Sequence, residues 1–257
     1  MNHTKIEWCE RTWNPVTGCF HRCEYCYAAD IARRFGGAEG GAKVRWIGDC
    51  VELDKPLYRV TTNGQRVYAP FPFGFFPTFH RYRLEEPQHS RKARNIFVCS
   101  MADLFGDWVP LRWIRDVLDA CQKAPKHRYL FLTKNPKQYD HLKTILLLPA
   151  GDRFWYGSTV TRTEDFVNRP IPALDPWCRK FLSIEPLLDR VDVWKMGSVP
   201  RWIIIGAETG NRKEKVIPQR DWVDDIAIYA EIHNIPVFYK NSLRKLFPDL
   251  PPSEFPW

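Results

Sequence analysis

Short apolar runs alternate with helical patterns from residue 95 to residue 240, and this alternation limits the possible folds more than any other feature. The apolar runs predict buried strands at Asn95–Cys99, Arg128–Thr133, Phe154–Val160, Phe181–Ile184, Trp202–Ile205 and Ile235–Tyr239. The segments between them predict helices at Leu111–Ala124, from Asn135 to about Leu147, at Glu164–Asn168 and from Asp221 to His233. Such alternation produces βαβ units and a mostly parallel sheet. With one more strand near Thr12–Asn14, we expect about seven strands in an α/β barrel or partial barrel.

Polar residues directly follow several of these strands. They are Ser100-Met101-Ala102-Asp103, Thr133-Lys134-Asn135, Ser158-Thr159, Ser183-Ile184-Glu185-Pro186 and Gly206-Ala207-Glu208-Thr209-Gly210. The carboxyl ends of parallel strands carry the chemistry in α/β folds. We therefore expect a shared site there, although any single one of these residues could be an ordinary turn or cap residue.

Two segments do not follow the alternation. Residues 36–94 are predicted to form an irregular insertion with aromatic residues at Phe71–Pro77 and basic residues at His80–Arg83 and Arg91–Arg94. Basic and aromatic side chains together can follow a nucleic-acid backbone and stack on bases, but they can also form a solvated loop. The proline-rich tail, 248–257, is expected to run over the surface of a single domain that spans residues 1–257.

The composition is that of a globular protein with a basic surface. A hydrophobic fraction of 44% with 26% charged residues excludes a disordered chain. No apolar run approaches the roughly 20 residues that cross a bilayer, so no membrane partner is expected. The first residues, Met1–Lys5, carry no apolar signal stretch, which predicts a cytoplasmic protein. The net charge of +8 suits a polyanionic partner.

Three of the eight cysteines are clustered, in the C-x3-C-x2-C pattern Cys19-Phe20-His21-Arg22-Cys23-Glu24-Tyr25-Cys26. Soft thiolates favour iron–sulfur centres or zinc, and three thiolates this close can hold one iron–sulfur cube with one iron left open. The alternative is a structural zinc site that adds His21, although zinc sites usually contain two separated ligand pairs. Cys9, Cys50 and Cys178 lie apart from the cluster, and an auxiliary cluster formed from them remains open.

The cysteine pattern, with Tyr25 before its third cysteine, resembles the signature of radical S-adenosylmethionine enzymes. Further motifs are similar to a phage-associated branch of that superfamily, whose members are mostly uncharacterised phage proteins. These motifs are Trp13-Asn14-Pro15-Val16-Thr17-Gly18-Cys19, Cys26-Tyr27-Ala28, Ser100-Met101-Ala102-Asp103-Leu104-Phe105-Gly106, Leu132-Thr133-Lys134, Ser183-Ile184-Glu185-Pro186-Leu187-Leu188 and Gly206-Ala207-Glu208-Thr209-Gly210. The branch has Gly-Gly-Glu where this chain has Gly206-Ala207-Glu208, and Lys-Gln-Trp-Gly where this chain has Lys240-Asn241-Ser242-Leu243.

The resemblance implies a partial (β/α)6 barrel with a 4Fe–4S cluster held by Cys19, Cys23 and Cys26. S-adenosylmethionine would bind the open iron, and its reductive cleavage would give methionine and a 5′-deoxyadenosyl radical that abstracts a substrate hydrogen. An electron donor such as flavodoxin or ferredoxin is implied as a partner. The cofactors perform this chemistry, and the protein orients them and excludes water and oxygen.

The cofactor motifs are also similar to those of spore photoproduct lyase, a DNA repair enzyme of the superfamily. By that similarity the residues that meet S-adenosylmethionine are Ser100 and Asp103 at its amino group, Lys134 at its carboxylate, Ser158 at its ribose or carboxylate, and Tyr25 near its adenine. A lysine that ends a buried strand is costly without an anionic partner, which independently favours this role for Lys134.

Three more residues are candidates for catalysis. Cys99 adjoins Ser100, where a thiol could return a hydrogen atom to a product radical, although it could equally be a small buried hydrophobe. Glu185 and Glu208 also follow strands, and either could hold the ribose hydroxyls or the substrate.

The sequence therefore predicts a radical S-adenosylmethionine enzyme that acts on a nucleic-acid base or nucleoside, in phage DNA modification or repair. If the chain is phage-encoded, its compartment is the host cytoplasm. A radical enzyme that acts on a small molecule or peptide is the first alternative. A zinc-stabilised nucleic-acid-binding module without catalysis is the second.

Overall fold

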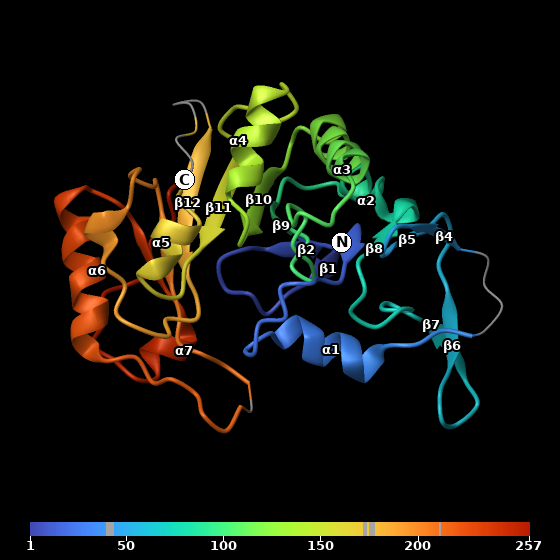
Figure 1. The fold of residues 1–257 in the computed structure, drawn as a ribbon, viewed down its shortest axis with the longest axis horizontal. Helices are drawn as coiled ribbons and strands as arrows, with labels where there is room; N and C mark the ends of the chain where they lie inside the picture. The colour runs from blue at the N-terminus through green and yellow to red at the C-terminus, as the bar shows by residue number, and fades with distance from the viewer. Residues whose placement is uncertain (40–43, 172–173, 175–177, 211) are drawn as a thin grey trace.

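The structure is a computed structural model that describes residues 1–39, 44–171, 174, 178–210 and 212–257. Within these residues, eight strands form one sheet in the order β1-β2-β9-β10-β11-β12-β13-β14 (Figure 1). The strands are β1 (Asn2–His3), β2 (Arg11–Trp13), β9 (Asn95–Val98), β10 (Arg128–Thr133), β11 (Phe154–Thr159), β12 (Arg179–Ile184), β13 (Ile203–Ile205) and β14 (Val237–Tyr239). Every neighbouring pair from β2 to β14 is parallel, whereas β1 pairs antiparallel with β2. The fold is mixed α/β.

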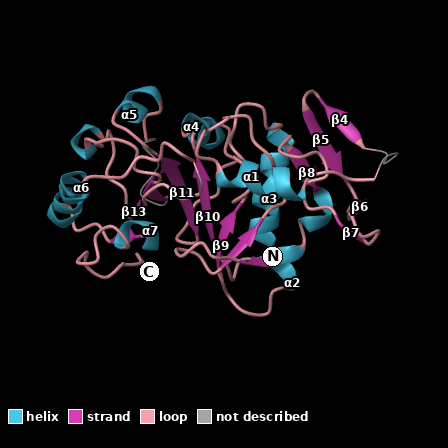
Figure 2. Ribbon diagram, turned by 90° about the horizontal axis from the view of Figure 1, so that it is seen from below, coloured by secondary structure: helices cyan, strands magenta, loops and turns pink. Residues whose placement is uncertain are grey.

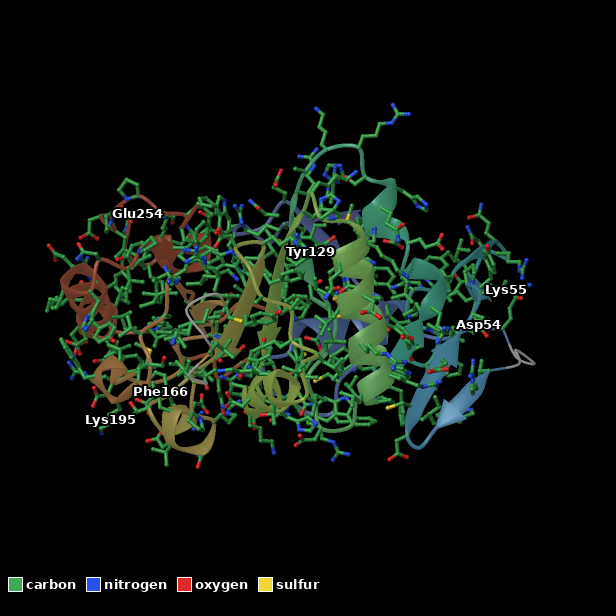
Figure 3. The ribbon with its side chains drawn as sticks, turned by 90° about the horizontal axis from the view of Figure 1, so that it is seen from above. Asp54, Lys55, Tyr129, Phe166, Lys195 and Glu254 are labelled. Carbon is green, nitrogen blue, oxygen red and sulfur yellow. The ribbon has the colours of Figure 1, made fainter. Side chains whose placement is uncertain are left out.

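Helices connect the successive parallel strands. They are α3 (Leu111–Lys123), α4 (Lys137–Thr144), α5 (Glu164–Asn168), the 3-10 turn η2 (Val193–Lys195) and α6 (Arg220–Ile232), with α7 (Asn241–Arg244) after the last strand. Figure 2 shows the strands β9–β11 in the middle of the molecule, with α6 at one end and β4 and β5 at the other. Apolar side chains fill the space between sheet and helices, and Tyr129 of β10 lies between the ends marked by Lys55 and Lys195 (Figure 3).

The alternation predicted for residues 95–240 is confirmed, and so is the number of parallel strands. The helix that begins near Asn135 ends earlier than predicted, at Thr144. Leu146 takes a positive φ of 58° and is 92% exposed, so the chain leaves the helix there, and Leu147 and Leu148 pack against the core from outside it.

The segment 36–94, expected to be an irregular insertion, contains five short strands and two short helices among its described residues, although most of those residues lie outside them. Four short strands form a second sheet in the order β3-β8-β5-β4, and two more form a hairpin. Their bounds are β3 (Val16–Thr17), β4 (Arg45–Ile47), β5 (Cys50–Leu53) and β8 (Thr78–His80), with β6 (Tyr58–Val60) and β7 (Arg66–Tyr68) in the hairpin. The helix α1 (Tyr27–Phe35) lies between β3 and β4 in the chain, and η1 (Arg81–Arg83) and α2 (Glu86–His89) follow β8. Residues 40–43 of the segment lie outside the described residues.

Three arginines of the basic segments His80–Arg83 and Arg91–Arg94 contact other parts of the protein. Arg81 lies within ion-pair distance of Asp54 and Asp116, and Arg94 pairs with Glu10. Arg83 forms no ion pair with a described residue, and it donates to the backbone carbonyl of Asn14 at 2.7 Å. Three of the arginines in the expected basic segments therefore already have partners within the protein.

The proline-rich tail packs against the sheet. The indole of Trp202 donates to the carbonyl of Glu254 at 3.0 Å, and Trp257 packs edge-on against Trp155 and Trp202. Among the described residues, no helix combines the length and the apolar character that a membrane crossing requires.

Candidate functional site

A cavity of about 210 Å³ lies at the carboxyl ends of the parallel strands. Each of the six strands from β9 to β14 contributes a residue at or just after its end: Asp103, Lys134, Thr159, Glu185, Glu208 and Lys240. The segment that follows β3 supplies the cysteine loop, 19–26, to the same cavity. This convergence follows from the parallel sheet, which brings the ends of all its strands to one edge.

Nine of the eleven residues that the sequence predicted for the site line this cavity. They are Cys19, Cys23, Tyr25, Cys26, Ser100, Asp103, Lys134, Glu185 and Glu208. The structure therefore brings the cysteine motif together with residues up to 189 positions away in the chain, the separation of Cys19 from Glu208 (208 − 19).

Cys99 and Ser158 are the two predicted residues that do not line the cavity. Cys99 is 2% exposed and belongs to the apolar core that includes Trp13 and Phe79. The sequence alternative of a small buried hydrophobe therefore describes Cys99 better than a hydrogen donor does. Ser158 is buried within β11, and the next residue, Thr159, lines the cavity instead. Successive strand residues point to opposite faces, so an error of one position places the wrong side chain in the site.

The three clustered cysteines are free thiols, each half-buried. Burial is the main reason that the pKa of Cys19 is raised to about 12, and the charges of Asp103, Cys23 and Cys26 act in the same direction. The loop is fixed at both ends. Cys19 donates its backbone N–H to the carbonyl of Phe75 at 3.1 Å, and Cys26 caps α1 by accepting a bond from the N–H of Ala29 at 3.4 Å.

Asp103 connects the cysteine loop to the end of β10. Its Oδ2 bonds with Nε2 of His21 at 2.8 Å and accepts from the backbone N–H of Lys134 at 2.9 Å. Its Oδ1 accepts from the Thr133 hydroxyl at 2.7 Å and from the N–H of Phe105 at 3.0 Å. Burial alone would raise the pKa of Asp103, but the bonds with His21, Lys134 and Thr133 lower it below its ordinary value. Both carboxylate oxygens are thus engaged, and Asp103 holds two parts of the site in place.

Lys134 lines the cavity without a carboxylate partner among the described residues. Its Nζ lies 5.3 Å from the centre of the Tyr25 ring, and both side chains line the cavity with the cysteines. Among the described residues, no acidic side chain is within ion-pair distance of Lys134. A half-buried ammonium group in this position is suited to an anionic ligand.

Glu185, just after β12, and Lys240, just after β14, form an ion pair across the end of β13. The Glu185 carboxylate accepts from Lys240 Nζ, from the Trp8 indole at 3.1 Å and from the Ser183 hydroxyl at 3.0 Å. Burial would lower the pKa of Lys240, but the adjacent Glu185 raises it above its ordinary value, so Lys240 is charged. Gly206 lies beneath the pair, where a Cβ would be 2.8 Å from Cδ of Lys240.

Glu208 is held by a cation that the sequence did not single out. Arg212 donates two bonds of 2.7 Å to the two carboxylate oxygens of Glu208, and Arg212 also lies 3.7 Å from Glu24 in the cysteine loop. The bond from Arg212 is the main reason that the pKa of Glu208 is below its ordinary value. Glu208 is therefore ionised and fixed beside the loop.

Ser100 joins this cavity to the neighbouring surface. Its hydroxyl donates to Oδ1 of Asn14 at 3.2 Å, and its carbonyl accepts from the Tyr27 hydroxyl at 2.8 Å. Asn14 also accepts from the backbone N–H of Met101 at 3.0 Å, which fixes the turn after β9.

The sequence did not single out Trp8 or Arg212, and it named Asn14, Thr159 and Lys240 only within a motif or a strand end, without a role of their own in the site. Lys240 directly follows a predicted strand and stands where the branch also has lysine, so the strand-end rule could have found it. Trp8 and Arg212 carry no comparable signal, because their contacts depend on how distant segments fold.

Cys9 and Cys50, two of the cysteines outside the cysteine loop, lie in different parts of the molecule. Cys9 lies near Glu185 and Lys240, whose charges act on its pKa in opposite directions. Cys50 donates to the carbonyl of Trp108. Among the described residues, no group of three or more His, Cys, Asp or Glu side chains is arranged around a single metal-ion position.

Replacing Lys240 with Met should lower the free energy of unfolding by about 2–3 kcal/mol, because it leaves the Glu185 carboxylate part-buried without its cation. Chemical denaturation of the single variants, Glu185→Gln and the double variant gives the coupling energy, which we expect to exceed about 1 kcal/mol. The control is Arg33→Met, which breaks the exposed Arg33–Asp30 pair and should cost less than about 0.5 kcal/mol. Equal losses for Lys240→Met and Arg33→Met would contradict the buried pair.

Comparison with known proteins identifies a family without identifying an activity. Residues 3–244 match the model of the family described as "Protein of unknown function (DUF5131)". Neither the curated proteins nor the solved structures gave a match. Because the match covers nearly the whole chain, this protein is a member of the DUF5131 family.

Proposed function

We propose that this protein is a radical S-adenosylmethionine enzyme, built on a partial (β/α)6 barrel, that acts on a nucleic-acid base or nucleoside in DNA modification or repair. One observation carries the proposal. Cys19, Cys23 and Cys26 line a single cavity with Lys134, which has no carboxylate partner among the described residues, at the carboxyl ends of parallel strands. The strand order supports the barrel, because the parallel strands follow one another in chain order as the (β/α) repeat requires.

The residues of the cysteine loop fit an iron–sulfur cluster. The donor set consists of three thiols, which are the ligands that iron–sulfur clusters use. Each thiolate of a cluster binds a different iron, so the sulfurs need to surround a cavity and need not converge on one point. Burial keeps Cys19 protonated in the metal-free protein, and a cationic centre would favour its thiolate form.

The other cavity residues fit S-adenosylmethionine. Lys134 would bind the carboxylate of its methionyl group, and Tyr25, which lies against Lys134, would cover the ligand on that side. Asp103 has both oxygens engaged, so we assign it the positioning of Lys134 and His21 in place of a direct bond to the cofactor. Glu185 and Glu208 each accept three bonds from the protein, one fewer than Asp103, so each carboxylate keeps a lone pair that suits it to accept a hydrogen bond from a hydroxyl of a ribose or substrate.

When bound, the cluster and S-adenosylmethionine supply reductive cleavage of the cofactor and removal of a hydrogen atom from the substrate, with an electron from a donor such as flavodoxin or ferredoxin. The chain itself provides binding, orientation and exclusion of water. Lys134 and the cysteine loop fix one end of the ligand, while Trp8 and Phe97 form an apolar wall of the cavity.

Replacing Lys134 with Met should weaken S-adenosylmethionine binding by about 10–100-fold, because one charge-assisted bond worth ~1.5–3 kcal/mol is removed while most of the side-chain volume remains. Calorimetric titration of the reconstituted variant measures the change, and iron content shows whether the cluster survives.

The matched control is Lys137→Met, three residues along the chain, where the lysine is exposed and pairs with Asp107 at 3.2 Å. We expect its affinity to equal that of the wild type. If Lys134→Met also binds S-adenosylmethionine as the wild type does, Lys134 has another role and the cofactor assignment of this cavity is wrong.

A further inference from the structure

A surface groove of about 980 Å³ continues from the cavity. Ile6, Tyr27, Ser100, Thr209 and Lys240 line both hollows, so the groove opens directly into the proposed site. The groove passes α1, the β6–β7 hairpin and the start of α7, and Figure 1 shows the hairpin beyond the end of α1. Its volume is at the upper end of the ~300–1,000 Å³ range of small-molecule pockets, which favours a substrate larger than a nucleoside.

Four tyrosines line the groove: Tyr27, Tyr58, Tyr68 and Tyr82. Tyr58 and Tyr68 lie directly opposite each other in the hairpin register, so their side chains are on the same face. Tyr27, Tyr58 and Tyr68 keep 46%, 37% and 40% of their surface exposed. Exposed aromatic rings along a groove are the platforms on which successive bases of a single strand stack.

A chain of hydrogen bonds fixes two of these tyrosines to the proposed site. The Tyr82 hydroxyl bonds with His80 Nδ1 and with the Tyr68 hydroxyl, both at 3.0 Å. Arg83 donates to the Tyr68 hydroxyl and to the carbonyl of Asn14, the residue that holds Ser100. Because burial lowers the pKa of His80 well below its ordinary value, the imidazole in this chain is neutral. The rings are thus ordered before any ligand binds, which lowers the entropy cost of stacking.

The charged residues of the groove favour a polyanion. Lys5 and Lys245 line it, and neither has an acidic partner among the described residues. The two carboxylates of the groove are already engaged, since Glu86 pairs with the terminal amine of Met1 and Glu7 accepts from the N–H of Asn241 at 2.7 Å. Unpaired cations beside exposed aromatic rings suit a phosphate backbone with its bases against the rings.

We propose that this groove binds a single strand of nucleic acid, with bases stacked on the tyrosines and one nucleotide directed past Tyr27 and Ser100 into the cavity. The inference rests on the proposed function, which supplies the chemistry of the cavity. A base inside an intact duplex cannot reach a buried site, so the strand must be single or locally opened.

The experiment measures binding of a fluorescent single-stranded DNA of about 12 nucleotides by anisotropy, a length within the site sizes of ~4–16 nucleotides known for such grooves. We expect the wild-type protein to bind this strand at least ~10-fold more tightly than the matched duplex. The double variant Tyr58→Ala/Tyr68→Ala should bind ~10–100-fold more weakly, whereas Tyr58→Phe, which keeps the ring, should bind as the wild type does. Lys245→Ala should lower the slope of log affinity against log salt by about 0.7.

The control is Arg201→Ala, which removes a cation from a separate cavity at the amino ends of the strands and should leave affinity and salt slope nearly unchanged. Thermal unfolding of every variant shows whether the fold is intact. Equal affinity of the double tyrosine variant and the wild type would overturn the inference, and so would equal competition by an acidic peptide. Cleavage of S-adenosylmethionine by the wild type is measured separately, so loss of that activity with tyrosine-dependent DNA binding intact would refute the proposed function alone.

Discussion

Replacing Cys19, Cys23 or Cys26 with Ala should remove the iron–sulfur cluster and abolish formation of 5′-deoxyadenosine. Each thiol is one of three that line the cavity in the cysteine loop, so the loss of any one leaves too few ligands for a stable cluster. Iron content, the visible absorption after anaerobic reconstitution and chromatography of the products measure the effect.

The matched control is Cys50→Ala, which removes a buried thiol from the second sheet. This variant should keep its iron and its activity, although it should be less stable. Full iron content in any of the three loop variants would contradict the assignment of the ligands.

Replacing Gly18 with Ala should displace the cysteine loop and cost about 2–6 kcal/mol of folding free energy, because backbone strain of ~1–3 kcal/mol adds to a steric clash of ~1–3 kcal/mol. Gly18 precedes Cys19 and has a φ of 88°, and a Cβ there would be 2.2 Å from the carbonyl oxygen of Phe76. Its N–H also donates to the carbonyl of Met101 at 2.8 Å, which ties the loop to the turn after β9. Denaturation curves and iron content after reconstitution measure the two consequences.

The variant Gly37→Ala separates the effect of backbone strain from that of the steric clash. Gly37 has a similar φ of 95°, but a Cβ there meets nothing within 4 Å. This control should lose only about 1–2 kcal/mol and bind iron normally. If the two glycine variants behave alike, close packing against Phe76 does not position the loop.

The main sheet could be predicted because its signals are local. Buried parallel strands such as Arg128–Thr133 are continuous apolar runs, and helices such as Leu111–Lys123 have a clear apolar face. The second sheet had no such signal. Its strands are two to four residues long, and Val16 pairs with Phe79, 63 residues later in the chain (79 − 16). Short strands with distant partners carry too little periodicity to be found from one sequence.

The candidate site could be predicted in outline for the same reason. Once the strands are known, the residues that follow them must meet at one edge, which correctly placed Lys134, Glu185 and Glu208 in a common cavity. At the end of β11 the alternation of side chains was assigned one residue too early, so Thr159 lines the cavity where Ser158 was expected.

Other features of the site depend on tertiary contacts. Asp103 bonds with His21 and the backbone of Lys134, and Glu208 bonds with Arg212, because the fold brings these groups together. Sequence spacing says nothing about such pairs. Likewise Cys99 follows a strand as Lys134 does, but it packs into the core.

Anaerobic incubation of the reconstituted wild-type protein with S-adenosylmethionine and a reductant tests whether the protein is a radical S-adenosylmethionine enzyme. We expect a brown protein with iron–sulfur absorption that converts S-adenosylmethionine to 5′-deoxyadenosine and methionine. A colourless protein that holds stoichiometric zinc and forms no 5′-deoxyadenosine would contradict it.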